Sequence, residues 1–246
     1  MFSTFLAAVR FLTICPLPPG GEDEEQALAA SPPFFPLAGL GIGLAAATAT
    51  LVLWPLLPSL PAATLIVLLL ATASGGLHLD GLADTADGFF SSRQREQMLA
   101  IMRDSRIGTM GVLALIFILA IKITALGSLE RGAAARAALL MPVAGRCALL
   151  LLMAQGRYVR DQGGLGTLFY RNRGRVKLGI GAIVGYCIMA VFLDGTGGLI
   201  ATVGLVVVLL LFAALCHRLI GGMTGDTLGA GCELAEAITA LLLAAL

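Results

Sequence analysis

The chain has 246 residues, of which 58% are hydrophobic and only 13% are charged, and its net charge is +1 at pH 7. In soluble domains about a quarter of the residues are charged. This composition, with a mean hydropathy of +0.94, therefore excludes an ordinary soluble domain and indicates a polytopic membrane protein. Because the net charge is close to zero, there is no basic field to attract nucleic acid, and we expect no nucleic-acid partner.

The first predicted element is a short N-terminal helix. Phe2, Phe5, Leu6 and Val9 recur at helical spacing, which predicts a helix that lies on the membrane surface or dips into it. The stretch lacks a basic leader and a clear cleavage site, so we do not expect a signal peptide. The acidic run at residues 22–25 predicts a solvated helix start.

Seven apolar segments follow, each close to the roughly 20 residues that a spanning helix needs. We expect an all-α fold: a polytopic transmembrane helical bundle of about seven spans plus the N-terminal interfacial or re-entrant helix. The absence of an internal repeat favours one integral-membrane domain over residues 1–246. The predicted spans are Leu37–Leu57, Pro61–Leu77, Ile107–Leu129, Ala137–Ala154, Leu178–Leu193, Leu199–Cys216 and Cys232–Leu246.

The basic residues indicate how these spans are oriented. Seven spans place residues 1–36, 78–106, 155–177 and 217–231 on one side, and the positive-inside rule makes that side cytoplasmic. We expect these polar segments to lie beside one another at the cytoplasmic face. The side holds twelve of the sixteen Lys and Arg residues, namely Arg10, Arg93, Arg95, Arg103, Arg106, Arg157, Arg160, Arg171, Arg173, Arg175, Lys177 and Arg218.

The most informative stretch is HLDGLADTADGFF, which begins at His78 and follows an apolar segment. Asp80, Asp84 and Asp87 are spaced i, i+4 and i+7, so on a helix they share one face. Three carboxylates on one face repel each other unless a cation lies between them, and hard oxygen ligands suit Mg²⁺, Mn²⁺ or Ca²⁺. A solvated acidic helix end is the alternative. The triplet predicts a cation site with a phosphate-bearing ligand and no particular reaction.

The following stretch, RQREQMLAIMRDSRIGTMGVLAL, supplies basic groups that could bind phosphate oxygens. Its arginines include Arg93, Arg103 and Arg106, and Asp104 lies between the last two. Each arginine is explained equally well as the boundary of the next span. Asp104 could simply pair with Arg103 or Arg106.

A third polar element, HRLIGGMTGDTLGAGCELAE, lies near the C-terminus. Acids that border a span are costly and usually functional, so Asp226 is predicted to bind metal or to orient the nucleophile. For Glu233 and Glu236 we favour a helix start, where acids complement the helix dipole. His78 and His217 border spans on the same side; each could act as a base, although an interfacial polar residue is the simpler interpretation.

Together these motifs resemble the cobalamin synthase family, the adenosylcobinamide-GDP ribazoletransferases. The resemblance is carried by LDGLADTADGFF, LAIMRDSRIGTMGVLAL and GGMTGDTLGAGCELAE, with RFLTICPLP and FFPLAGLGIG nearer the N-terminus, and it runs essentially end to end. It implies a multi-pass enzyme of the bacterial inner membrane whose active site faces the cytoplasm. Such an enzyme joins adenosylcobinamide-GDP to α-ribazole, or α-ribazole 5′-phosphate, in cobalamin biosynthesis, and releases GMP with Mg²⁺ as cofactor.

On this reading the site residues take definite roles. Asp80, Asp84 and Asp87 are expected to hold the metal, and Asp84, Asp87, Asp104 and Asp226 to be catalytic. One acid must take a proton from the attacking ribose hydroxyl, and Asp87, Asp104 and Asp226 all remain open. Membrane lipid would surround the chain, and a homo-oligomer is left open. The expected substrate-binding residues are Arg93, Arg103, Arg106 and His78.

There are two alternatives, of which only the second belongs to a different functional class. A CDP-alcohol phosphotransferase performs the same chemistry on lipid headgroups, but that family has an arginine where this chain has Asp84. A cation transporter usually binds its ion near the bilayer midplane, often at broken helices in repeated halves. Here the aspartates cluster at one surface beside arginines that would repel a cation.

Overall fold

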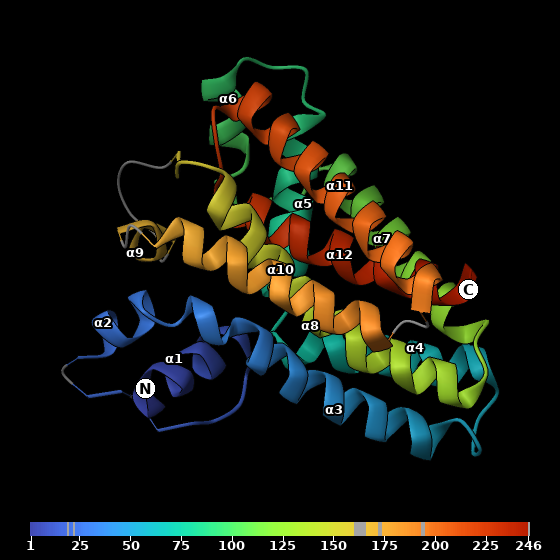
Figure 1. Cartoon of the computed structure of the whole chain (residues 1–246). Coiled ribbons are helices and arrows are strands. Elements are labelled where there is room, and N and C mark those ends of the chain that lie inside the picture. Colours follow the sequence, from blue (N-terminus) through green and yellow to red (C-terminus); the bar gives the residue numbers. More distant parts are fainter. Residues whose placement is uncertain (19, 22, 160–165, 172–173, 193–194, 246) are drawn as a thin grey trace.

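Figure 1 shows the computed structural model of the chain, which describes residues 1–246 except 19, 22, 160–165, 172–173, 193–194 and 246. Within these described residues every regular element is helical, as predicted. Arg160 and Arg173 of the predicted basic side lie outside the described residues, as do Glu22, Leu193 and Leu246. The elements are α1 (Phe2–Leu12), α2 (Glu24–Ala29), η1 (Pro32–Phe34), α3 (Phe35–Leu53), α4 (Ser59–Ala73), α5 (Leu77–Phe89), α6 (Arg95–Ile101), α7 (Thr109–Gly127), α8 (Arg131–Gln155), α9 (Gly166–Arg171), α10 (Arg175–Phe192), α11 (Gly195–Ile220) and α12 (Gly225–Ala245).

Five helices are long and apolar enough to cross a membrane, and α4 with α5 forms a sixth candidate that is bent by 89°. The five are η1 with α3, α7, α8, most of α11, and α12. The chain is therefore a polytopic helical membrane protein, as predicted, with five or six candidate spans in its described part rather than about seven. The predicted span Pro61–Leu77 is α4, which has only 15 residues. The predicted span Leu178–Leu193 is α10, whose apolar part falls short of 18 residues.

The bend between α4 and α5 has a local cause. Gly75 and Gly76 adopt φ angles of +61° and +73°, in the left-handed region that glycine enters without steric cost. The apolar helix therefore ends at Ala73, and α5 leaves at 89° to it. In Figure 1, α5 rises through the middle of the molecule while α4 lies at the lower right. The aspartate-rich stretch thus becomes a helix of its own instead of continuing the span.

Helix α8 is the centre of the bundle. In its most apolar window 83% of residues are buried, against 28–33% for α3, α7 and α11, and α3, α10 and α12 pack against it (Figure 1). Gly39 and Gly43 of α3 form a small-xxx-small pair that permits close helix packing. A Cβ atom at Gly43 would meet the Leu139 carbonyl of α8, and one at Gly39 would meet the Pro142 carbonyl.

Three of the polar segments that the sequence places on one side contact one another. Arg95 Nε on α6 donates to the Ile220 carbonyl at the end of α11 over 2.7 Å. The Val159 N–H, after α8, donates to the Met223 carbonyl, before α12, over 2.9 Å. Through these two contacts, α6 lies against the end of α11, and the segment that follows α8 lies against the segment that precedes α12.

Candidate active site

Helix α5 packs against both α7 and α12, and two glycines let it touch α12. A Cβ atom at Gly81 would meet the backbone of Asp226, and one at Gly229 would meet the backbone of His78. Only glycine permits backbones to approach this closely. The contact sets the start of α5, with Asp80, beside the start of α12, with Asp226.

A cavity of about 200 Å³ opens at this junction. Asp80, Asp226, His78 and Tyr158 contribute its polar lining. Asp80 is exposed and also lines a wider hollow of about 620 Å³. His78, a predicted substrate-binding residue, is 3% exposed and forms part of the cavity wall. The remaining wall is mainly apolar and includes Phe11, Leu149, Met153, Phe169 and Leu228.

Asp87 has different surroundings from Asp80. Its Oδ2 accepts a hydrogen bond from the Gly108 N–H over 2.6 Å, and its Oδ1 accepts one from the Gly111 N–H over 2.8 Å. These N–H groups belong to the start of α7, where the helix has unpaired donors and partial positive charge. Asp87 therefore fastens α5 to α7. This contact leaves its predicted role as a metal ligand open.

The donor chemistry of α5 fits a hard cation. Asp80 and the half-buried Asp84 lie one helical turn apart. Among the described residues, no three His, Cys, Asp or Glu side chains converge as a ready-made metal site. Mg²⁺ is usually held by only one or two carboxylates, and substrate phosphates complete its shell. Two carboxylates and a diphosphate are therefore a sufficient set.

Asp104 forms a local ion pair instead of joining the other aspartates at the cavity. Arg106 Nη2 lies 2.6 Å from Asp104 Oδ2, and the Arg106 N–H donates to Oδ1 over 3.0 Å. The hydrogen bonds from the Arg106 side chain and backbone lower the pKa of Asp104 to about 2. Arg93, Arg103 and Arg106 are exposed, and none of them is among the described residues that line the 200 Å³ cavity.

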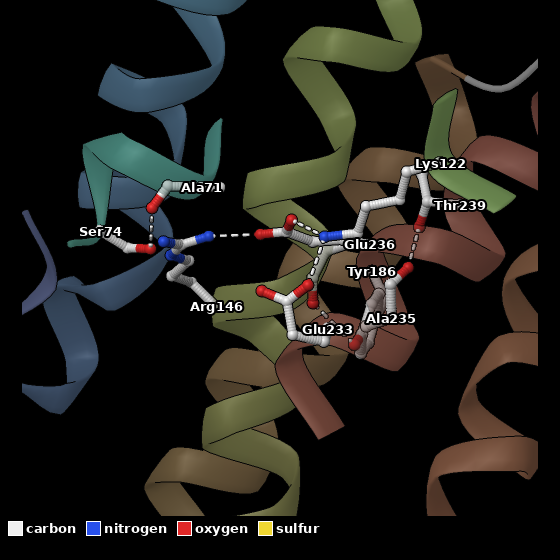
Figure 2. A network of polar contacts seen from close by, with 10 residues as sticks. Ala71, Ser74, Lys122, Arg146, Tyr186, Glu233, Ala235, Glu236 and Thr239 are labelled. Atoms are coloured by element: carbon white, nitrogen blue, oxygen red, sulfur yellow. Dashed lines mark hydrogen bonds and ion pairs between the residues drawn. The ribbon is translucent and has the colours of Figure 1, made fainter. Parts of the chain in front are cut away.

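Sequence reasoning missed a cluster of four buried charges, which Figure 2 shows. Lys122 Nζ on α7 lies 2.6 Å from Glu233 Oε2 and 2.7 Å from Glu236 Oε2, both on α12. Arg146 Nη1 on α8 lies 2.5 Å from Glu236 Oε1. The interpretation of Glu233 and Glu236 as a helix start is wrong, because α12 begins at Gly225 and the two acids lie roughly two and three turns inside it.

The charges of this cluster balance. Two cations and two carboxylates are each at most 4% exposed, and buried ions require such pairing. His78 lies within electrostatic reach of Arg146, Glu236 and Lys122, so the cavity wall adjoins the cluster. The sequence did contain a signal for this cluster. Lys122 and Arg146 lie inside apolar segments, and so do two acids spaced three residues apart, Glu233 and Glu236.

Comparison with known proteins gives the family. The profile of the family described as cobalamin-5-phosphate synthase matches residues 4–244. The chain belongs to this family. It is 42% identical over 255 residues to an adenosylcobinamide-GDP ribazoletransferase of Citrobacter koseri, and 43% identical over 248 residues to one of Klebsiella pneumoniae. Each alignment covers 99% of this chain and 100% of the relative. No solved structure matches the chain. The resemblance drawn from the motifs is confirmed at the level of the family.

Proposed function

We propose that the chain is an adenosylcobinamide-GDP ribazoletransferase, acting as one integral-membrane catalytic domain over residues 1–246. It transfers the cobinamide phosphate of adenosylcobinamide-GDP to α-ribazole, or α-ribazole 5′-phosphate, and releases GMP. The observation that carries this proposal is the full-length similarity, at 42% and 43% identity, to two enzymes of that name. The junction of α5 and α12 supports it, because acidic side chains meet there at a cavity.

The reaction is a displacement at phosphorus. A ribose hydroxyl of α-ribazole attacks the cobinamide-linked phosphorus, a new P–O bond forms, and the bond to the bridging oxygen breaks, so that GMP leaves with that oxygen. The hydroxyl proton passes to a carboxylate. We assign this step to Asp226, because, of these three candidate acids, it is Asp226 that is among the described residues lining the cavity.

We infer that Mg²⁺ is the cofactor and that Asp80 and Asp84 would hold it, with Asp87 as the third predicted ligand. Bound there, Mg²⁺ would supply positive charge against the diphosphate and the departing GMP. The side chains of Arg93, Arg103 and Arg106 are exposed on the segment after α5. From there they would bind the outer parts of these anionic substrates rather than the groups inside the cavity.

The bacterial inner membrane is the inferred location, with the site facing the cytoplasm. The positive-inside rule supports this orientation, because twelve of the sixteen Lys and Arg residues fall in the segments predicted on the side that also holds Asp80 and Asp226. Large apolar side chains such as Leu44, Ile188 and Leu211 are 54%, 56% and 65% exposed on α3, α10 and α11. Membrane lipid is the environment that suits such a surface.

The test is product formation by purified, detergent-solubilised protein given adenosylcobinamide-GDP and α-ribazole, with and without Mg²⁺. We expect one GMP for each cobalamin product, and neither when one substrate or the metal is omitted. GMP release without a cobalamin product would contradict the transfer. Formation of a lipid phosphodiester from CDP-linked donors would instead favour the lipid-headgroup alternative.

A further inference from the structure

The 200 Å³ cavity has two kinds of wall. Asp80 and Asp226 supply carboxylates, whereas Phe11 and Phe169 supply aromatic rings. The rings of Phe11 and Phe169 are tilted against each other with centroids 5.1 Å apart, and Phe169 also meets Phe35 edge-on at 5.6 Å. Phe11 of α1 and Phe169 of α9 thus line the same cavity as the acids of α5 and α12, and Phe35 of α3 contacts Phe169.

We propose that this cavity binds the base of α-ribazole. The proposal rests on the proposed function, because α-ribazole is a substrate only in that reaction. Its base is dimethylbenzimidazole, a flat pair of fused rings whose outer ring bears two methyl groups and no hydrogen-bonding group. Such a ring stacks on aromatic side chains and buries its methyl edge against apolar ones.

The size of the cavity agrees with a single base. An apolar cavity of about 150 Å³ binds benzene, and whole drug-sized ligands occupy about 300–1,000 Å³. At about 200 Å³, the cavity is large enough for two fused rings and far too small for a corrinoid. The rest of both substrates would lie outside it, where Asp80 also lines the wider hollow of about 620 Å³.

The wall favours the methylated base over guanine, the other base present in the reaction. Leu77, Leu149, Met153 and Leu228 offer apolar surface and no side-chain hydrogen bond. Guanine placed against these side chains would bury its polar edge, and an unpaired polar group loses its hydration without compensation. Among the described lining residues, the side chains that could pair with it are His78, Asp80, Tyr158 and Asp226. The benzimidazole methyl groups gain from the same burial.

This placement also sets up the chemistry. The ribose is attached directly to the base, so a base held among the aromatic rings brings the ribose to the carboxylates on the same cavity wall. Those carboxylates are Asp226, assigned to accept the proton, and Asp80, assigned to the metal. The cavity would therefore position the attacking hydroxyl, whereas the two acids are assigned only to the proton and the metal.

The first test compares two cavity variants with a matched control. Phe11→Leu and Phe169→Leu keep an apolar side chain but remove the ring. We expect each to raise the KM for α-ribazole about tenfold, in line with the contribution of one aromatic stacking contact, with kcat and the KM for adenosylcobinamide-GDP within about twofold of wild type. Phe34→Leu is the control. Phe34 is also half-buried in the N-terminal region, and its ring meets Phe5 at 6.1 Å, outside the described cavity lining.

A second test measures equilibrium binding of α-ribazole to the solubilised protein without the donor substrate. We expect weaker binding by the Phe169→Leu variant, unchanged binding by Phe34→Leu, and little displacement by GMP. Equal binding by all variants, while wild type still forms cobalamin, would overturn the base site and leave the proposed function intact. If GMP displaced bound α-ribazole as effectively as unlabelled α-ribazole does, the cavity would bind guanine instead. A wild-type protein that forms no cobalamin would overturn both proposals.

Discussion

Glu236 contacts both cations of the buried cluster, so its loss should be the most damaging single change there. Its Oε2 lies 2.7 Å from Lys122 Nζ and its Oε1 lies 2.5 Å from Arg146 Nη1 (Figure 2). Glu236→Gln preserves the shape but leaves two buried cations with only Glu233. In the Glu233→Gln variant, by contrast, each cation keeps its contact with Glu236.

The magnitude follows from burial and depth. Glu236 lies about 16 Å along α12 from its start at Gly225, near the middle of a hydrocarbon core of about 30 Å, so water cannot replace the lost carboxylate. Removing one partner of a buried ion pair costs about 3–5 kcal/mol. We expect Glu236→Gln to lie at the upper end of this range and Glu233→Gln at the lower end.

A charge-balanced double variant tests the reason for this cost. Arg146→Met combined with Glu236→Gln leaves the neutral pair of Lys122 and Glu233, whose Nζ and Oε2 atoms are 2.6 Å apart. We expect this variant to lose at least about 1 kcal/mol less than the sum of the two single changes, as coupled neighbours do.

The assay is reversible unfolding in mixed micelles, followed by circular dichroism. Glu96→Gln is the control, because that side chain is 78% exposed and exposed substitutions usually stay within about 0.5 kcal/mol. The reasoning is refuted if Glu236→Gln is no less stable than Glu233→Gln, or if the losses in the double variant simply add.

Three further predictions concern packing, helix anchoring and pH. Gly43→Val should prevent folding, because a Cβ there meets α8 backbone, whereas Gly41→Val should be tolerated, because nothing lies within 4 Å; the yield of monodisperse protein compares them. Asp87→Asn should destabilise the protein by about 1–2 kcal/mol, since an amide nitrogen cannot accept one of the two α7 hydrogen bonds, and amide exchange in the first turn of α7 should accelerate. The Asp104 carboxyl should titrate with a pKa of about 2 instead of 3.8; the stabilisation by its pair is then present above pH 3.8 and lost as pH falls through about 2. Carbon-13 NMR of labelled aspartate checks this, and Arg106→Gln should return the pKa towards 3.8.

Much of the fold could be predicted because apolar length and turn residues determine it locally. The span starting near Leu37, the N-terminal helix and the aspartate-rich helix all follow from such patterns. The end of the second span was predicted less well: it was expected at Leu77, whereas α4 ends at Ala73 and Ser74, Gly75 and Gly76 form a turn. The turn at Gly75 and Gly76 depends on positive φ angles, and α5 is held in its bent position by packing on α7 and α12.

The candidate site also has features that the sequence predicted and features that it could not predict. Spacing predicted that Asp80, Asp84 and Asp87 share a helix face. Asp226 was predicted as a further site residue because it borders a span, and the structure does set Asp226 against α5. Spacing could not predict that Asp87 would anchor α7, because that contact depends on where the next helix begins. The aromatic wall with Phe11 was also missed, since it exists only once α1 docks against segments more than a hundred residues away.

The most direct test of the site at the α5–α12 junction is the rate of GMP release by aspartate variants at saturating substrates and Mg²⁺. We predict that Asp226→Asn lowers this rate by about 10²–10⁴-fold, the range for loss of an acid–base group, and that Asp80→Asn also lowers it through loss of a metal ligand, in protein that remains folded. Asp104→Asn, which removes only the local pair with Arg106, should stay within a few-fold of wild type. A fully active Asp226→Asn variant, or an inactive but folded Asp104→Asn variant, would contradict the site.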